Sequence, residues 1–409
     1  MNRALLAGLS GTLANQTYID VLGNNIANAN TIGYHEGRVT FQDTFYDTLR
    51  GGRSGAGVGM GGLNPAQVGS GTSIGQIQTL HTQGAMSYSG SPLDAAIEGN
   101  GMFVLSNAAG GYYYGRDGSF VLDDTQTLVA GGSGMQVMGW MANAGTVTPT
   151  GEPQTLTFPI GEVSPGRPTQ NVSIGGNLDA GLEVGSVRTA TVATYDSLGL
   201  SHEVSLSFTR TATPNRWTCT AISEGVTATG TVDFDGANGG VSSGGTLALS
   251  VPLTNGASSP LAFTLDLGQV TQLNQTGSNV VALSQDGTPS ATLSGISIVE
   301  GGNVQGQYSD GHIEVLGQIA VAAFGNVGGL VRTGNNMYQL GANSGQVSLG
   351  GAGTGGRGEI RSRQLEMSNV DLTRSFVEIM TAQRGFQAST RVISAANRML
   401  DDVMQLNIS

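Results

Sequence analysis

The chain has 409 residues and a formal net charge of −12, yet only 11% of its residues are charged. A typical soluble domain has about 25% charged residues, so Ser, Thr, Asn, Gln and Gly must cover much of this surface. An acidic chain without a basic patch repels phosphate backbones, which argues against nucleic acid as a partner. The length predicts roughly two to three domains.

The basic and sulfur-containing residues exclude several chemistries. All 17 basic residues are Arg, because the sequence contains no Lys. This rules out a lysine nucleophile, a phosphate-binding loop that needs Lys, and a lysine cross-link. The single cysteine, Cys219, cannot form an intramolecular disulfide, and we expect it to be half-buried on a strand beside Trp217.

The first residues resemble a signal peptide only faintly. Arg3 precedes a short apolar run, but that run ends at Gly8 and no small-residue cleavage site follows. We therefore expect no cleaved signal peptide. No stretch approaches the roughly 18 apolar residues that span a bilayer, so we expect a chain that is not embedded in a membrane.

The first thirty or so residues predict an amphipathic helix that ends near Gly33. Its large apolar residues share one face: Leu6, Leu9, Leu13, Leu22 and Ile26. The stripe has a polar break at residues 15–17. Such a narrow stripe is too little to hold a lone helix together in water, so this helix needs a partner.

A second, longer helix is predicted from a Ser-x-x-Asp cap at residues 368–371 to about Leu406. Large apolar residues recur in it every seven positions: Leu372, Ile379, Phe386, Ile393 and Leu400. Mostly small residues follow each of them by three: Ser375, Ala382, Ser389, Ala396 and Val403. This heptad pattern predicts a coiled-coil-like pairing within or between subunits. A long helix lying on its own domain is the alternative.

Three arginines of the second helix, Arg384, Arg391 and Arg398, also recur every seven residues, opposite the large apolar residues. A solvated face is one interpretation of this row. Contact with other subunits, or the lining of an interior, is the other.

The middle of the chain predicts half-buried strands. Apolar residues alternate with polar ones in three places: Val204, Leu206 and Phe208; Leu261, Phe263, Leu265 and Leu267; Ile313, Val315, Ile319, Val321 and Ala323. This period of two is typical of strands. Four Asp-Gly pairs suggest tight hairpins: Asp117-Gly118, Asp235-Gly236, Asp286-Gly287 and Asp310-Gly311. We therefore expect an all-β middle of sandwich or barrel type.

Two Gly-rich stretches, 51–62 and 350–358, are predicted to be linkers near the two ends of the chain. If the terminal helices pair, the body is entered and left at the same end, so its domains are nested. The fold class is thus mixed and multidomain, with paired long terminal helices and nested all-β domains. The predicted division is a helical domain from 1–30 and 366–409, connecting segments 31–72 and 350–365, an inner β domain from 73–146 and 287–349, and an outer inserted β domain over 147–286.

Motifs for catalysis or ligand binding are weak. Residues 353–358 lack a full G-x-G-x-x-G and its strand-to-helix setting. Asp233-Phe-Asp235-Gly236 lacks the Glu that would complete a calcium loop, so a hairpin turn is the better interpretation. The four histidines are dispersed, at 35, 81, 202 and 312. We therefore expect no catalytic, cofactor-binding or metal site, and no enzyme.

Several blocks resemble the axial proteins of the bacterial flagellum, the family of rod and hook subunits. Residues 22–34 (LGNNIANANTIGY) resemble the signature near the start of these proteins. Residues 98–104 (EGNGMFV), 115–120 (GRDGSF) and 137–140 (VMGW) resemble further family blocks. Residues 368–372 (SNVDL) and 380–388 (MTAQRGFQA) resemble the C-terminal signature. Together they cover about the first 145 and the last 125 residues in the family's order.

The middle of the chain decides which members are most similar. Residues 175–178 (GGNL) and 195–199 (YDSLG) resemble the outer domain of hook members, and residues 283–287 and 293–296 resemble its return to the inner domain. A distal rod subunit lacks most of this insertion. The resemblance therefore favours a hook member over a distal rod or hook–filament junction subunit, which remain the alternatives.

The resemblance implies a structural subunit that polymerises with itself into a short curved tube outside the cell. That tube is a universal joint between rod and filament, and the terminal helices line its central export channel. The implied partners are rod and junction proteins, the hook cap and the flagellar type III export apparatus. Phe41 and Phe45 fit the Phe-x-x-x-hydrophobic element of early export substrates, although they could equally be packing anchors.

Two other classes of protein compete with this interpretation. A Gly-rich secreted adhesin or surface-layer protein predicts tandem repeats and a cleavable signal or anchor, and neither is visible in the sequence. An enzyme on a β-sandwich scaffold would need catalytic residues, and we can nominate none.

Overall fold

The computed structural model describes residues 2–54, 61–107, 109–143, 145–274 and 277–406. Its contacts divide the chain into two compact units. Unit 1 comprises Met1–Phe158, Ile296–Gln305 and Glu314–Ser409, and unit 2 comprises Pro159–Gly295 and Gly306–Ile313. Two long helices lie at the ends of the chain and the rest is mainly β-strand, so the mixed, multidomain fold class is confirmed. No helix in the described ranges is long and apolar enough to cross a membrane.

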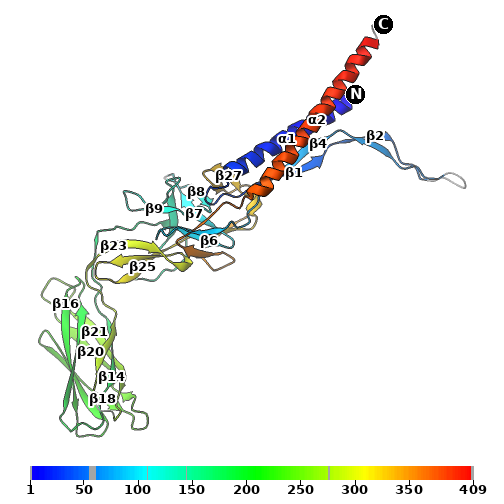
Figure 1. Ribbon diagram of the computed structural model, residues 1–409. Coiled ribbons are helices and arrows are strands. Elements are labelled where there is room, and N and C mark those ends of the chain that lie inside the picture. The colour runs from blue at the N-terminus through cyan, green and yellow to red at the C-terminus, as the bar shows by residue number, and fades with distance from the viewer. Residues whose placement is uncertain (1, 55–60, 108, 144, 275–276, 407–409) are drawn as a thin grey trace. The chain divides into compact units, whose positions relative to one another are not determined.

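The terminal helices of unit 1 are α1 (Asn2–Ala27) and α2 (Leu372–Leu406), and they lie side by side (Figure 1). They run antiparallel, because Gly8 faces Ile393 whereas Tyr18, further along α1, contacts Glu378. Both chain ends therefore lie at the same end of the helix pair.

The polar break expected at residues 15–17 does not interrupt α1. Asn15 and Thr17 instead donate side-chain hydrogen bonds to the carbonyl oxygens of Gly11 and Leu13, each four residues earlier, at 2.7 and 3.2 Å. Their polar groups are thus satisfied by the helix itself. The helix ends at Ala27 rather than near Gly33, because Asn28 to Gly33 form turns, with Gly33 at a φ of 66°.

The expected cap of α2 is displaced by three residues. Asp371, not Ser368, precedes the first helical residue, and its Oδ1 accepts the backbone N–H of Arg374 at 3.1 Å. This is the standard bond of an N-cap residue to the third helical amide. Ser368 accepts from the backbone N–H of Val370 and shapes the turn before the helix.

The strands of unit 1 form short ribbons near the helices and a sheet system around a core. Those before residue 159 are β1 (Gly37–Asp43), β2 (Tyr46–Arg50), β3 (Ala66–Gly69), β4 (Thr72–Thr79), β5 (Met86–Tyr88), β6 (Ala95–Glu98), β7 (Met102–Ser106), β8 (Tyr112–Gly115), β9 (Phe120–Leu122), β10 (Leu128–Ala130), β11 (Gln136–Met141) and β12 (Gln154–Thr155). Those after residue 313 are β26 (Val321–Phe324), β27 (Val331–Gly334), β28 (Met337–Gln339), β29 (Val347–Gly350), β30 (Glu359–Ser362) and β31 (Gln364–Glu366).

Strands from the two halves of unit 1 pair with one another. β7 pairs with β8, β11 and β26, β6 pairs with β30, and β5 pairs with β31. The core between them contains Met102, Val104, Tyr114, Trp140 and Tyr338, all buried. The residues that lead into α2 are thus fixed by strands that precede residue 99. β23 (Ala291–Ile298), β24 (Asn303–Tyr308) and β25 (Ile313–Ile319) each have residues in both units, and two short 3-10 helices span Glu300–Gly302 and Val327–Gly329.

The Gly-rich stretches are not simple linkers where the structure describes them. Residues 350–358 form a tight turn between β29 and β30, in which the Arg357 side chain donates to the carbonyl of Gly351 at 3.0 Å. Around 51–62, β2 pairs with β3 and Arg53 bridges to Leu63 in a hairpin, while residues 55–60 lie outside the described ranges. The glycines in the described parts of these stretches therefore allow tight turns, and they do not make a flexible linker.

Two of the four Asp-Gly pairs are hairpin turns. Asp235-Gly236 joins the paired strands β18 and β19, as the sequence predicted, and Asp310-Gly311 joins β24 and β25. The other two connect strands that do not pair. Asp117 accepts from Ser119 on the way to β9, and Asp286 caps the backbone amides of Gln170 and Asn171. Aspartate bonds to nearby amides in any tight turn, so the dipeptide alone overpredicted hairpins.

Unit 2 is a β-sandwich, as the alternating pattern predicted. One sheet has the order β15-β16-β17-β18-β19 and the other the order β20-β21-β14-β22. The strands are β13 (Val163–Ser164), β14 (Asn171–Asn177), β15 (Val187–Tyr195), β16 (Ser201–Arg210), β17 (Arg216–Ser223), β18 (Val226–Phe234), β19 (Val241–Ser243), β20 (Thr246–Val251), β21 (Leu261–Thr271) and β22 (Val281–Gln285).

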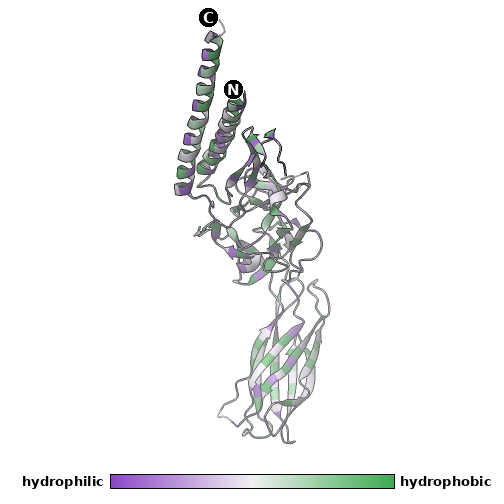
Figure 2. Cartoon of the chain, turned by 90° about the vertical axis from the view of Figure 1, so that its right-hand side faces the viewer, coloured by the Kyte–Doolittle hydropathy of each residue, from purple (hydrophilic) through white to green (hydrophobic). Residues whose placement is uncertain are grey.

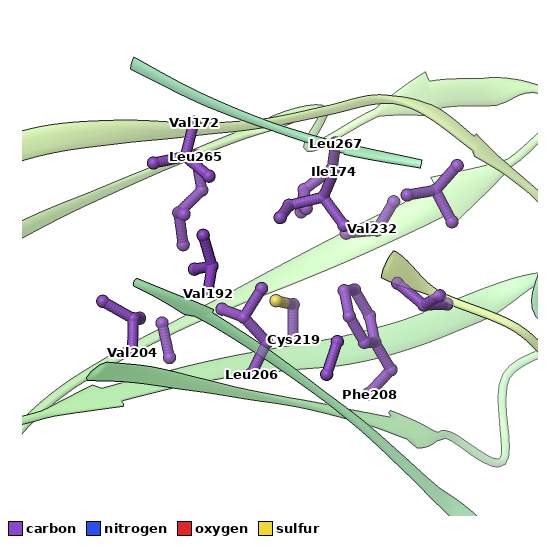
Figure 3. Close-up of a cluster of buried hydrophobic side chains, with 14 of the residues drawn as sticks. Val172, Ile174, Val192, Val204, Leu206, Phe208, Cys219, Val232, Leu265 and Leu267 are labelled. Atoms are coloured by element: carbon purple, nitrogen blue, oxygen red, sulfur yellow. The ribbon is translucent and has the colours of Figure 1, made fainter. Parts of the chain in front are cut away.

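The core of unit 2 lies between its two sheets (Figure 3). Leu206 and Phe208 of β16 point into it from one sheet, and Leu265 and Leu267 of β21 from the other. Cys219 is fully buried in this core rather than half-buried, and burial raises the pKa of its thiol to about 12. The thiol therefore stays protonated and packs as a small apolar group.

Candidate assembly surface on the terminal helices

The contact between α1 and α2 is built on small residues. A Cβ added to Gly8 would lie 2.8 Å from Cγ1 of Ile393, and one added to Gly11 would lie 2.8 Å from the Ser389 hydroxyl. On the α2 side, a Cβ added to Gly385 would lie 2.7 Å from Oδ1 of Asn15. Real Cβ atoms do not approach other atoms this closely, so glycine allows the two backbones to come near each other.

A polar contact joins α1 and α2 at the end of the helix pair that is nearer the β-strands. The Tyr18 hydroxyl donates to Oε2 of Glu378 at 3.1 Å, and the Arg374 guanidinium donates to Oε1 of the same carboxylate at 2.8 Å. Burial, followed by the charge of Glu378, raises the pKa of Tyr18 to about 12. The tyrosine therefore remains a donor at any ordinary pH.

The structure separates the apolar residues predicted for α1 into two groups. Leu22 is buried and Ile26 is half-buried, whereas Leu6, Leu9 and Leu13 are at least half exposed. The side of α1 that meets α2 is instead its Gly8–Gly11–Asn15 side. Leu6 and Leu9, with Leu5 and Ile393, line a shallow apolar hollow of about 400 Å³.

The predicted seam of α2 faces inward more consistently. Its small residues Ser375, Ala382 and Ala396 are buried, and Ile379, Phe386, Ile393 and Leu400 are half-buried. Leu372, at the first turn, is 42% exposed, and Val403 at the far end is 48% exposed. The helix pair thus covers one side of each helix.

Large apolar side chains of α2 outside the predicted seam are also exposed: Phe376, Val377, Met380, Val392, Met399 and Met404. Figure 2 shows hydrophobic residues recurring along both helices. Exposed large apolar side chains that gather on one element mark interaction surfaces.

The row of Arg384, Arg391 and Arg398 is exposed on α2. Within the described residues none of the three forms an ion pair, whereas Arg374 on the same helix pairs with Glu378. This exposure fits a solvated face, and contact with other subunits or the lining of an interior stays a prediction.

The base of the helix pair is a buried ionic cluster around Glu366, the last residue of β31. Its carboxylate has no exposed side-chain area and lies 2.9 Å from Nη1 of Arg116 and 3.4 Å from Nε2 of His35. The backbone N–H of Gly84 also donates to it, at 2.9 Å. Burial by itself would raise the pKa of Glu366, but the hydrogen bond with His35 and the charge of Arg116 outweigh it and hold the pKa below its usual value.

Two asparagines fasten the chain on either side of this cluster. Asn25 of α1 makes a pair of hydrogen bonds with the backbone N–H and C=O of Gly37, at 2.9 and 2.8 Å. Asn369, just before α2, accepts from the backbone N–H of Glu36 at 2.8 Å and donates to the carbonyl of Leu80 at 2.9 Å. These bonds join the segment after α1 to the segment before α2.

Phe41 and Phe45 differ in their surroundings. The Phe41 ring packs edge-on against Tyr18, with ring centroids 5.5 Å apart, while Phe45 is 90% exposed. The packing interpretation therefore suits Phe41 and not Phe45. A role of either residue in export stays a prediction.

Sequence reasoning missed the residues that set the helix contact and its base. Gly8 was interpreted only as the end of an apolar run and Gly11 was not singled out, although residues three apart share one face of a helix. His35, Arg116 and Glu366 carried no such signal, because their partners lie far away in the sequence: Arg116 and Glu366 are 250 residues apart.

The glycine contact can be tested with Gly8→Val. The new side chain meets Ile393 and the Ser389 carbonyl, and overpacking of this kind costs about 1–3 kcal/mol. We expect a lower melting temperature of the helical circular dichroism signal. Gly23→Val is the matched control, since it puts the same β-branched residue into α1 where no atom lies within 4 Å. Equal losses in the two variants would contradict the contact.

The cluster also predicts a pH dependence. Burial, followed by the charges of His35, Arg332 and Arg116, lowers the pKa of His81 from 6.5 to about 4. Between these values the unfolded chain binds a proton at His81 that the folded chain does not, so the free energy of unfolding falls as the pH drops from about 6.5 to 4. We expect His81→Gln to flatten this slope in denaturant titrations of unit 1. An unchanged slope would refute the assignment.

Comparison with known proteins gives the same family along the chain. Four family descriptions match: "Flagella basal body rod protein" over residues 5–35, "Flagellar hook protein FlgE/F/G D1 domain" over 96–177, "Flagellar basal body protein FlaE D2 domain" over 185–288, and "Flagellar basal body rod FlgEFG protein C-terminal" over 361–406.

Whole relatives match as well. The flagellar hook protein FlgE of Treponema pallidum is 34% identical, over 99% of this chain and 100% of that relative, and FlgE of Borreliella burgdorferi is 34% identical over the same shares. The crystal structure of Helicobacter pylori flagellar hook protein FlgE2 is only 16% identical but has a TM-score of 0.53 over 69% of this chain and 100% of that one, so the fold is shared. This chain belongs to the flagellar hook protein FlgE family.

Proposed function

We propose that this chain is a structural subunit of the flagellar hook and polymerises with itself into a short, curved tube. The observation that supports this most is the apolar surface of the helix pair. Leu6, Leu9 and Leu13 of α1 and a longer set on α2 are exposed although the two helices already contact each other. Covering this surface needs further helices, which neighbouring copies of the chain would supply.

The tube would transmit torque from the rod to the filament as a universal joint. In this proposal the terminal helices, residues 1–30 and 366–409, pair in a coiled-coil-like manner with those of neighbours and line a central export channel. Segments 31–72 and 350–365 connect them to an inner β domain (73–146 and 287–349), and an outer β domain (147–286) is inserted into it. Small residues at the helix contact, such as Gly8 and Gly385, support close packing of helices.

Bending requires outer parts of neighbouring subunits to slide past each other. The low proportion of charged residues and the many Ser, Thr, Asn and Gly residues favour polar, hydrated contacts there. Such contacts cost little desolvation when they break and re-form. The apolar helices would hold the polymer together while the β domains move.

The proposal includes a place and partners. The subunit would act outside the cell, after export without a cleaved signal peptide by the flagellar type III apparatus, with Phe41 and Phe45 as candidates for recognition by it. Its neighbours would be rod proteins, hook–filament junction proteins and, during assembly, the hook cap. The role is mechanical, not enzymatic.

The double variant Leu9→Gln, Leu13→Gln tests the role of the helices. It removes exposed apolar area and leaves Gly8 and Gly11 in place, so we expect a folded monomer that fails to form tubes under conditions where the unchanged chain does. Circular dichroism checks the fold and electron microscopy checks the tubes.

A matched control is Leu198→Gln, Leu200→Gln in unit 2, since these two leucines are exposed to a similar degree. We expect this control to polymerise. Tubes of normal diameter from the Leu9, Leu13 variant would contradict the proposal.

A further inference from the structure

Two histidines far apart in the sequence meet at the base of the helix pair. His35 lies between α1 and β1, and His81 follows β4. Their Nδ1 atoms are 3.2 Å apart, and the two rings are nearly perpendicular, with an interplanar angle of 86°. His35 is buried and His81 is half-buried.

The other nitrogen of His35 is already occupied. Its Nε2 faces Oε1 of Glu366 at 3.4 Å, and a buried carboxylate is an acceptor, so Nε2 carries the ring proton. The lone pair of neutral His35 is therefore on Nδ1, where it accepts a hydrogen bond from Nδ1–H of His81. A metal ion at this point would take the place of that proton, which His81 would then carry on Nε2. A histidine held in this way by a carboxylate is the usual arrangement behind a metal-binding imidazole.

A cavity of about 310 Å³ adjoins both rings. Its lining includes His35, His81, Arg116, Gly101 and Gly356. The space is large enough for several water molecules. Ligands from solvent could thus reach the same point as the two imidazoles.

We propose that His35 and His81 form a binding site for a divalent transition-metal ion such as Zn²⁺, held through the two Nδ1 atoms, with water from the adjoining cavity completing the coordination. Zn–N bonds are about 2.0–2.1 Å long, so two nitrogens 3.2 Å apart correspond to an N–Zn–N angle of about 100°, close to tetrahedral. Imidazole nitrogen is a preferred ligand of zinc, copper and nickel.

The charges around the site influence its affinity for a metal ion. Arg116 and Arg332 oppose a cation, whereas the Glu366 carboxylate favours one and also pairs with Arg116. A metal ion is ligated by neutral imidazole, so it competes with protons at both rings. Within the described ranges no group of three or more His, Cys, Asp and Glu side chains is arranged to hold a metal. The site therefore has two protein ligands, and its metal exchanges with solvent.

A bound metal would link three segments at the base of the helices. His35 follows α1, His81 follows β4, and Glu366, behind His35, precedes α2. Binding here would stabilise unit 1 at the place where both chain ends leave its β-strands. The site needs no neighbouring subunit, so its test is independent of polymerisation.

The test titrates the full-length monomer at pH 7.5 with zinc chloride as the probe. We expect one zinc ion per chain by isothermal titration calorimetry, and a rise of at least about 2 °C in the unfolding temperature of unit 1 at saturation. A dissociation constant on the order of 1 mM is the weakest binding that the proposal allows. Absence of a binding signal at about 1 mM zinc would therefore overturn it.

Variants separate this site from adventitious binding. His81→Gln should abolish the calorimetric signal, His81→Cys should restore binding through a thiolate, and His312→Gln, at an exposed histidine elsewhere, should leave it unchanged. With Co²⁺ as probe, His81→Cys should add a sulfur-to-cobalt charge-transfer band. Zinc binding that survives His81→Gln, or that is lost in His312→Gln, would overturn the assignment to His35 and His81. This holds even if the unchanged chain binds zinc as expected.

Discussion

The buried carboxylate of Glu366 is the constraint around which unit 1 is arranged. A carboxylate without solvent contact is tolerated only when it is paired and hydrogen-bonded, and here Arg116, His35 and the Gly84 amide meet that requirement. These partners come from the segments after α1, before β5 and after β8. Removal of Arg116 would leave the Glu366 carboxylate buried without its charge partner, which is strongly destabilising. The cluster therefore holds the helices at one place on the β-strands.

From that base the helices contact each other through their smallest residues. Gly8 and Gly11 meet Ile393 and Ser389, so the backbones come close while the leucines of α1 remain on other faces. A single chain therefore buries only part of the apolar surface of its two helices. A helix pair with large apolar residues left exposed is stable chiefly in contact with more helices, and that is the property a self-assembling tube requires.

Periodic features could be predicted from the sequence and long-range polar partners could not. The alternation in β16 and β21, the sandwich of unit 2 and the inward side of α2 follow from repeats of two and seven residues. The face of α1 that contacts α2 could not be predicted in this way. The leucine spacing identified a stripe that the structure leaves half exposed, whereas glycines make the contact. The cap at Asp371, the turns at Asp117 and Asp286 that are not hairpins, and the role of the Gly-rich turn at 350–358 depended on which amides lie nearby, and composition does not reveal that. The Glu366 cluster joins residues up to 331 positions apart, beyond the reach of any local pattern.

The central claim is that the terminal helices are completed by neighbouring copies of the chain, and amide hydrogen exchange tests it most directly. Exchange would be measured residue by residue in monomers and in assembled tubes. The account predicts at least about tenfold greater protection of the α1 and α2 amides in tubes, with the strands of unit 2 equally protected in both states. Helix amides that are as strongly protected in the monomer as in the tube would contradict it.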